Sequence, residues 1–155
     1  MSRKLITEFK NKHYYLSNFF PCILYYEGRL YSNVEAAFQA QKTTSTMLKD
    51  MFSKCDGLEA KKLAKNLPVD DEFLNKQDNI MRELLKCKFE QNPILMKMFL
   101  TLPVDVELVN RNYYWDDYWG VPICKGGLKG QNKLGKLLME LRKEFEEKIS
   151  YSQNV

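Results

Sequence analysis

The chain has 155 residues, of which 45% are hydrophobic and 28% are charged, a composition that suits one domain with a sizeable apolar core. Its 24 basic and 20 acidic residues leave a net charge of +4, which permits a phosphorylated or polyanionic ligand without requiring one. The four cysteines lie far apart and His13 is the single histidine, so the sequence supports neither a disulfide framework nor a closely spaced zinc site.

The first thirty residues are rich in strand and turn signals. Leu5–Phe9 is predicted to form a short strand, and Tyr14–Phe20 an aromatic-rich loop. Residues 23–31 predict a hairpin whose turn contains Gly28.

A helix is predicted to follow directly, over residues 33–42. Ser32 and Glu35 have the S-x-x-E spacing of a capping box. At about 100° per residue, one face holds Glu35, Phe38, Gln39 and Lys42, and so joins a carboxylate, an amide and an amine. Two interpretations of this face stay open. Either it belongs to an active site, or Glu35 serves only the cap and Lys42 is a solvated cation at the helix end.

The remainder of the chain is predicted to be mainly helical. The expected helices cover residues 47–52, 58–65, 72–91, 94–100 and 133–148, with a strand over residues 104–109. Asp56 and Glu59 repeat the capping-box spacing at the start of the second of these helices. The basic residues of the helices are interleaved with acids and are expected on solvated faces; they include Lys61, Lys62, Lys65, Lys86 and Lys88.

These elements predict an α+β fold, with one predominantly helical domain over residues 1–149, a small antiparallel β element, and a flexible tail over residues 150–155. The sequence has no apolar run of about 18 residues and no leader after Met1. We therefore expect a cytoplasmic chain with reduced thiols and no membrane contact.

The segment Tyr113–Gly120 has the most unusual local composition. Its Asp116 and Trp119 allow two interpretations. Either an aromatic cluster contains an aspartate that satisfies the loop, or an aromatic wall lies beside an acid that holds sugar hydroxyls or moves a proton.

Residues 130–137, GQNKLGKL, nearly match the phosphate loop G-x-x-x-x-G-K-[ST]. Leu137 replaces the metal-binding hydroxyl, and no buried strand precedes the segment, so a nucleotide triphosphatase is excluded. The glycine-rich stretch 126–130 before the last helix can cradle a diphosphate with backbone amides, or can serve only as a tight turn. His13 has no Ser or Cys nucleophile nearby in the sequence, so a hydrolase triad has no specific support.

Four segments, in this order, resemble the NADAR (YbiA-like) family. They are LSNF at 16–19, SNVEAAFQAQK at 32–42, DDYWG at 116–120 and GQNKLGKLLMELR at 130–142, and KFEQN at 88–92 is a further match. The resemblance implies a YbiA-like fold, a compact and largely helical α+β domain. It also implies N-glycosidase chemistry, the cleavage of the bond between a base-type nitrogen and C1 of a ribose, without a cofactor or a metal.

By this resemblance Lys42 and Glu35 form the reactive pair, and Asp116 and Trp119 complete the pocket. The resemblance also implies a substrate-binding set, which consists of Asn18, Phe19, Gln39, Asn110, Trp119, Gly120, Gly130 and Asn132. Asn110 departs from the Leu-Val-Glu pattern of many family members, since an amide keeps a hydrogen bond but carries no charge.

The implied substrates carry ADP-ribose or ribose phosphate. The first interpretation is removal of ADP-ribose from guanine, in a nucleotide or in ADP-ribosylated DNA or RNA. The alternatives are phosphoribosylated riboflavin-pathway intermediates, and a catalytically silent module that binds ADP-ribose or an NAD derivative. Neutral Lys42 would attack C1 and pass through a ring-opened Schiff base, or Glu35 or Asp116 would activate water instead. The oligomeric state is not predicted.

Overall fold

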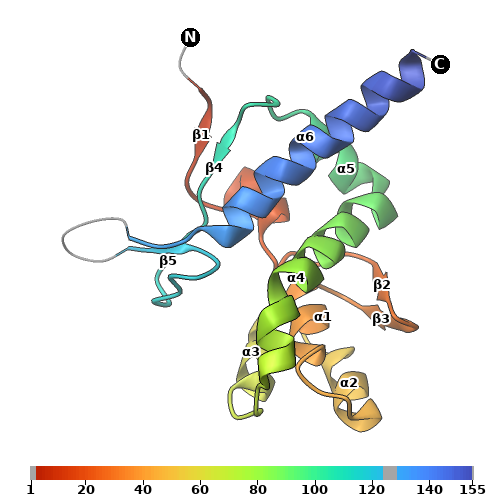
Figure 1. The fold of residues 1–155 in the computed structure, drawn as a ribbon, viewed down its shortest axis with the longest axis vertical. Coiled ribbons are helices and arrows are strands. Elements are labelled where there is room, and N and C mark those ends of the chain that lie inside the picture. Colours follow the sequence, from red (N-terminus) through yellow and green to blue (C-terminus); the bar gives the residue numbers. More distant parts are fainter. Residues whose placement is uncertain (1–2, 124–128, 155) are drawn as a thin grey trace. The chain divides into compact units, whose positions relative to one another are not determined.

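The computed structural model describes residues 3–123 and 129–154 (Figure 1). The chain divides into two compact units, one formed by Tyr14–Leu95 and the other by the two ends of the chain, up to His13 and from Met96 onward. Helices dominate both, which confirms the predicted α+β class. In the part of the chain that the structure describes, no helix has the length and apolar character needed to span a membrane.

The unit Tyr14–Leu95 is organised around one short buried helix. Its elements are the strands β2 (Leu24–Tyr26) and β3 (Arg29–Tyr31) and the helices α1 (Val34–Ala40), α2 (Thr46–Phe52), α3 (Gly57–Ala64) and α4 (Asp71–Gln91). Helix α1 contacts all the others, and every one of its residues is buried. Apart from Glu35 and Gln39, the residues of α1 are apolar, namely Val34, Phe38 and three alanines, which suits a helix buried in a core.

The hairpin β2–β3 forms as predicted. Leu24 pairs with Tyr31 in an antiparallel register, and both turn residues, Glu27 and Gly28, have positive φ angles of 46° and 81°. Two positive φ values in a two-residue turn match the right-handed twist of the strands. On the other edge of β2, the side-chain amide of Gln91 exchanges hydrogen bonds of 2.6 and 2.9 Å with the backbone of Tyr25. This amide at the end of α4 therefore takes the place of a third strand.

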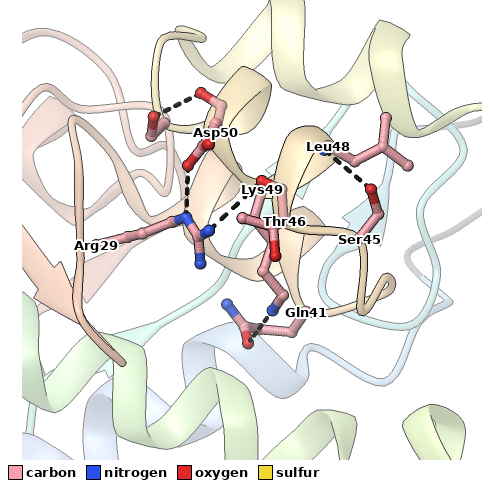
Figure 2. Close-up of polar contacts among 8 residues, drawn as sticks. Arg29, Gln41, Ser45, Thr46, Leu48, Lys49 and Asp50 are labelled. Atoms are coloured by element: carbon pink, nitrogen blue, oxygen red, sulfur yellow. Dashed lines mark hydrogen bonds and ion pairs between the residues drawn. The ribbon is translucent and has the colours of Figure 1, made fainter.

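Polar contacts join the hairpin, α2 and the end of α1 (Figure 2). Arg29 of β3 forms an ion pair of 2.8 Å with Asp50 of α2. Lys49, the residue before Asp50 in α2, donates a hydrogen bond of 3.3 Å from its Nζ to Gln41 Oε1. Gln41 is the C-cap of α1, so these contacts anchor the residue that directly precedes Lys42.

Helix α4 packs on α1 through an apolar stripe that includes Phe73, Met81, Leu84 and Phe89. Lys88 lies on the same stripe and is 0% exposed, so the prediction of a solvated Lys88 is wrong. The physical reason is its position seven residues after Met81, which returns it to the buried face of the helix.

The second unit contains α6 (Lys133–Gln153) and two short parallel strand pairs. Strand β1 (Leu5–Ile6) pairs with β4 (Glu107–Leu108), and β5 (Arg111–Asn112) pairs with β6 (Val121–Pro122). Helix α6 contacts β4. Helix α5 (Pro93–Leu100) begins in the first unit and ends in this one, where Phe99 meets Phe145 of α6 edge to face.

Four predicted boundaries are corrected. The strands predicted at residues 5–9 and 104–109 each cover only two residues, and they pair with each other in parallel. Their extent depends on this pairing between distant segments and not on the local pattern of residues. The predicted loop at Tyr14–Phe20 begins inside a 3₁₀ helix, η1 (Asn11–Leu16). Helix α6 does not end at residue 148 but continues to Gln153. In this last part of the helix, Ser152 Oγ donates a hydrogen bond of 2.9 Å to the Lys148 carbonyl.

Candidate functional site

The N-terminus of α1 differs by one residue from the prediction. Asn33, not Ser32, is the N-cap, and its Oδ1 accepts a hydrogen bond of 2.7 Å from the Ala36 amide. Ser32 Oγ instead donates to the Cys55 carbonyl at 3.2 Å. Glu35 is therefore not in the capping-box position, which leaves its carboxylate for other contacts.

Glu35 lies at the centre of a small buried polar group. The residue is only 8% exposed, and its Oε1 accepts a hydrogen bond of 2.8 Å from Gln39 Nε2. Its backbone amide donates to the Asn18 carbonyl at 3.1 Å, which brings the loop before the hairpin onto the first turn of α1. The structure thus brings the Asn18 backbone and the Gln39 side chain into contact with Glu35.

Asn18 and Gln39 each retain a side-chain oxygen that has no hydrogen-bond partner. Asn18 Oδ1 and Gln39 Oε1 are buried and unsatisfied, in residues 8% and 7% exposed. A buried amide oxygen without a donor costs about 1–3 kcal/mol. Both oxygens are acceptors, so a ligand that brings hydroxyl or N–H donors would relieve the cost.

Lys42 follows the helix instead of lying within it, because α1 ends at Ala40. Lys42 lies in the turn that follows the helix, and its amide donates a hydrogen bond of 3.1 Å to the Gln39 carbonyl. Its Nζ lies 6.0 Å from the ring centroid of Phe38 and 5.9 Å from that of Phe73. Burial lowers the pKa of the Lys42 amine, and the Glu35 carboxylate opposes this with the smaller effect.

Phe19 is held against the start of α3. A Cβ on Gly57 would meet its ring at 2.6 Å, so only glycine lets the helix and the ring approach this closely. Lys61 Nζ of α3 lies 5.8 Å from the same ring centroid. The Asn18–Phe19 segment is therefore fixed between α1 and α3.

The loop that contains Asp116 and Trp119 lies in the second unit. Asp116 Oδ1 accepts hydrogen bonds of 3.1 and 3.0 Å from the amides of Tyr118 and Trp119. Asn112 binds the same loop from the strand side, with its Nδ2 donating to the Asp116 carbonyl at 2.9 Å. The Trp119 indole meets Tyr118 edge to face at 4.8 Å. One oxygen of Asp116 therefore satisfies the loop, as the first of the two sequence interpretations expected. The aromatic core that the same interpretation expected is wrong for Tyr113, Tyr114 and Trp115, which are exposed.

Further contacts hold this loop in place, and they involve Asn110, Asn132, Gly120 and Gly130. Asn132 joins Leu108 and Asn110, since its Nδ2 donates to the Leu108 carbonyl at 2.9 Å and its Oδ1 accepts from the Asn110 amide at 2.9 Å. A Cβ on Gly120 would overlap the Asn110 carbonyl oxygen, and one on Gly130 would overlap the Gly120 carbonyl oxygen. Asn110 Nδ2 also points to the Trp119 carbonyl at 3.4 Å, a contact that a glutamate could not make because it has no donor when ionised.

The predicted residues thus fall into two groups. Asn18, Phe19, Glu35, Gln39 and Lys42 lie in the unit Tyr14–Leu95. Asn110, Asp116, Trp119, Gly120, Gly130 and Asn132 lie in the other unit. Most of the glycine-rich stretch, 126–128, falls outside the described residues. No cluster of three or more His, Cys, Asp or Glu side chains suited to a metal occurs among residues 3–123 and 129–154.

Sequence reasoning gave neither Phe73 nor Lys88 a role beside the candidate site residues. Phe73 covers the Lys42 amine from α4, and Lys88 is buried behind the Asn18 segment. Helical periodicity in α4 was a usable signal for both, because each recurs on the stripe that Met81 and Leu84 define.

Comparison with known proteins places the chain among described relatives. The model of the NADAR domain matches residues 6–146. N-glycosidase YbiA of Escherichia coli (strain K12) is 30% identical over 134 residues, which cover 83% of this chain and 79% of that protein. The protein of the same name from Shigella boydii serotype 4 (strain Sb227) is 31% identical over a stretch of the same length.

Two further likenesses concern a longer protein and a solved structure. A riboflavin biosynthesis protein of Vibrio vulnificus (strain YJ016) is 29% identical over 143 residues, which cover 90% of this chain but only 38% of that protein. The NMR structure of E. coli YbiA superposes with a TM-score of 0.78 at 28% identity, covering 96% of this chain and 88% of that one. The predicted YbiA-like fold is thereby confirmed.

Proposed function

This chain belongs to the NADAR domain family, and from that premise we propose that it is an N-glycosidase, a hydrolase that cleaves the bond between a base-type nitrogen and C1 of a ribose. The names of the YbiA relatives support the reaction class. The observation that carries the proposal is the group around the end of α1, where a buried carboxylate lies near a lysine whose pKa burial lowers.

Lys42 is the proposed nucleophile. Its neutral amine attacks C1, the bonding pair of the C1–N bond leaves with the base, and the base takes up a proton. The attacking nitrogen gives up the proton that the base receives. Its second proton passes to the ring oxygen as the C1–O bond breaks and the sugar ring opens to a Schiff base, and water hydrolyses this to release the sugar and restore the amine. The lowered pKa supports this role, since it makes the neutral amine available at a lower pH than an exposed lysine would allow.

Glu35 is the proposed proton carrier for the same steps. It is held in place by Gln39 and by the link from its own amide to Asn18, so its carboxylate cannot swing freely. A carboxylate near the amine can take the proton that Lys42 loses and return it to the departing nitrogen. Direct attack by water that Glu35 or Asp116 activates is the second mechanism.

Ribose hydroxyls suit the two unsatisfied oxygens. Asn18 Oδ1 and Gln39 Oε1 lack donors, and each hydroxyl of a ribose brings one. Gln39 Nε2 donates a hydrogen bond to Glu35, the proposed proton carrier at C1, so the hydroxyl we assign to Gln39 Oε1 is the one next to C1, on C2.

ADP-ribosylated guanine, in a nucleotide or in DNA or RNA, is the substrate we propose first. The name of the Vibrio relative favours a second candidate, a phosphoribosylated intermediate of the riboflavin pathway. Asp116 and Trp119 remain predicted substrate contacts on the strength of the family resemblance, with Trp119 stacking on the departing base.

The test is incubation with ADP-ribosylated guanosine and with phosphoribosylated riboflavin-pathway nucleotides, followed by mass spectrometry for free ADP-ribose or ribose phosphate. Borohydride added during turnover should trap a sugar adduct on Lys42, located by peptide mapping. Turnover without an adduct would favour the water mechanism. Binding of ADP-ribose in a calorimeter without turnover of either substrate would favour the catalytically silent module.

A further inference from the structure

The unit Tyr14–Leu95 buries a second lysine, Lys88 of α4, for which the proposed reaction has no use. It is 0% exposed, and its Nζ donates a hydrogen bond of 2.9 Å to the Ser17 carbonyl. The ring centroids of Phe20 and Phe89 lie 6.0 and 5.5 Å from the ammonium. Burial lowers the pKa of Lys88 to about 8, and the Cys22 thiol opposes this shift.

No carboxylate pairs with this ammonium among the residues that the structure describes. Burying a cation without an anionic partner is unfavourable, and an apolar residue on the same stripe would avoid the cost. The favourable contact that offsets this cost is the charge-assisted hydrogen bond from Lys88 Nζ to the Ser17 carbonyl.

That hydrogen bond ends on the peptide that joins Ser17 to Asn18. The Ser17 carbonyl also accepts from the Phe20 amide at 3.1 Å, so both of its lone pairs are used and its direction is fixed. Seven residues before Lys88 on the same face of α4, Met81 Sδ accepts a hydrogen bond of 3.5 Å from Asn18 Nδ2. Helix α4 therefore holds both the backbone and the side chain of this segment.

The other side of the same segment meets α1. The Asn18 carbonyl accepts the Glu35 amide at 3.1 Å, so the Lys88 ammonium and the Glu35 backbone contact adjoining carbonyls of one stretch of chain. The Ser17 and Asn18 carbonyls belong to consecutive peptide planes that are joined at the Asn18 Cα. A displacement of the Ser17–Asn18 peptide would therefore also shift the carbonyl that receives the Glu35 amide and the Asn18 side chain.

We propose that Lys88 is a positioning residue, which acts through the Ser17–Asn18 peptide to fix the first turn of α1 and so to place the Glu35 carboxylate and the Asn18 amide. The effect on turnover rests on the proposed function of Glu35. The mechanical link from Lys88 to the Glu35 amide does not, and it can be measured separately.

The test uses three variants of the full chain. Lys88→Met keeps the length of the side chain and removes both charge and donor, and Lys88→Gln keeps an N–H donor without the charge. Lys86→Met is the matched control, because Lys86 is on the same helix with a side chain that is 32% exposed and lies 4.0 Å from Glu90. The readouts are the melting temperature, the hydrogen-exchange rate of the Glu35 amide by NMR, and kcat and KM separately.

We expect Lys88→Met to fold with a melting temperature no lower than that of the wild type. Its Glu35 amide should exchange about tenfold faster or more, while amides within α3 are unchanged. Its kcat should fall about 10- to 100-fold with KM within about threefold, and Lys88→Gln should keep an intermediate kcat. Lys86→Met should match the wild type in every readout. A residue that served stability alone would lower the melting temperature and leave kcat of the folded fraction unchanged.

Unchanged exchange of the Glu35 amide in folded Lys88→Met would overturn the proposal. So would faster exchange without any loss of kcat, or failure of both Lys88 variants to fold, which would make Lys88 a folding residue. If the wild type turns over no N-ribosyl substrate, the proposed function fails, and the exchange rates alone then support or overturn the link between Lys88 and Glu35.

Discussion

The two groups of candidate site residues differ in how their polar atoms are satisfied. Around α1, Asn18 and Gln39 bury oxygens without donors, and burial lowers the pKa of Lys42. In the loop of the second unit, Asp116 Oδ1 receives two backbone amides, and Asn112 binds the loop backbone. The first group retains hydrogen-bonding capacity that a substrate can use, whereas the second uses much of its capacity to hold its own backbone.

This difference separates two kinds of residue, although the sequence analysis assigned both to one candidate site. Groups that are buried, unsatisfied or shifted in pKa are costly to the free protein, and such groups gather where chemistry occurs. Groups already satisfied by backbone amides stabilise a loop. We therefore expect substitutions near α1 to change turnover more than stability, and the reverse in the Asp116 loop.

The largest expected effect is that of Lys42→Ala. Removal of the nucleophile should lower kcat by about 10³-fold or more, while the affinity for ADP-ribose in a calorimeter changes less than about threefold. Lys49→Ala is the control, since burial also lowers the pKa of Lys49 and it contacts Gln41 directly before Lys42. Near-normal kcat in Lys42→Ala would remove the basis for placing chemistry at the end of α1.

The cost of burying Lys88 should be visible in the pH dependence of stability. The folded pKa of about 8 lies below the unfolded value of 10.5, so below about pH 8 the folded state pays to keep the proton. Between these values the unfolded state binds more protons, and the free energy of unfolding should rise with pH by about 3 kcal/mol from this group. In Lys88→Met this rise is absent.

Denaturant unfolding at pH 7.5 and at about pH 10.5 would test this in both proteins. Both proteins carry Cys22→Ala, because the Lys88 charge lowers the pKa of the Cys22 thiol and the two groups titrate together. The remaining titrations cancel in the difference, so the stability gap between Lys88→Met and the protein that keeps Lys88 should shrink by that amount as pH rises. A gap that does not change with pH would show that Lys88 carries no such cost.

The Glu35→Gln variant should change the pH profile of turnover in a defined direction. The reactive form of Lys42 is the neutral amine, so the rate should rise with pH through the pKa of Lys42, which lies below 10.5. The Glu35 carboxylate raises that pKa, and its removal should move the rising limb to lower pH while kcat falls about 30-fold from the lost proton carrier. A limb that moves to higher pH, or does not move, would contradict the electrostatic link between the two residues.

Much of the first group could be predicted because it depends on local pattern. The contact between Glu35 and Gln39 on α1 needs only the 3.6-residue period, and the capping box of Asp56 and Glu59 forms as its spacing predicts. The predicted helix is too long at its end, because Lys42 lies in the turn after α1. The same spacing at Ser32 and Glu35 gave a wrong cap. There the Glu35 amide is taken by the distant Asn18 carbonyl, and the adjacent Asn33 caps the helix instead.

What could not be predicted depends on contacts between distant segments. Two-residue parallel strands such as β5 and β6 have no periodicity to detect, and only their pairing defines them. Lys88 was predicted to be solvated because it lies among charged neighbours, although its position on the stripe of Met81 and Leu84 indicated burial. Whether Asp116 serves the loop or a substrate also depends on where backbone amides lie, which the sequence does not state.

A smaller effect should follow from removing the acceptor at Gln39. The wild type should prefer a ribosyl substrate over its 2′-deoxy analogue, because the analogue leaves Gln39 Oε1 without a donor. Gln39→Leu should reduce this preference in kcat/KM by about tenfold. Comparing both substrates on both proteins cancels the intrinsic lability of the deoxy compound.

Gln41→Leu is the matched control for this experiment, since the Gln41 amide is already satisfied by the Ala37 carbonyl and by Lys49. It should leave the substrate preference unchanged. An unchanged preference in Gln39→Leu would mean that the 2′-hydroxyl has another partner.

The smallest expected effect concerns Asp116, and it bears most directly on the comparison. Asp116→Asn keeps the oxygen that accepts the Tyr118 and Trp119 amides, whereas Asp116→Ala removes it. If Asp116 holds the loop, Asn should stay within about threefold of wild-type kcat/KM, and Ala should lose about 1 kcal/mol of stability in denaturant unfolding. Asp117→Asn, at an exposed neighbour, controls for the loss of charge. A base loses its function in both variants, so a fall of 100-fold or more in Asn as well as Ala would place Asp116 among the catalytic residues and remove the distinction between the two groups.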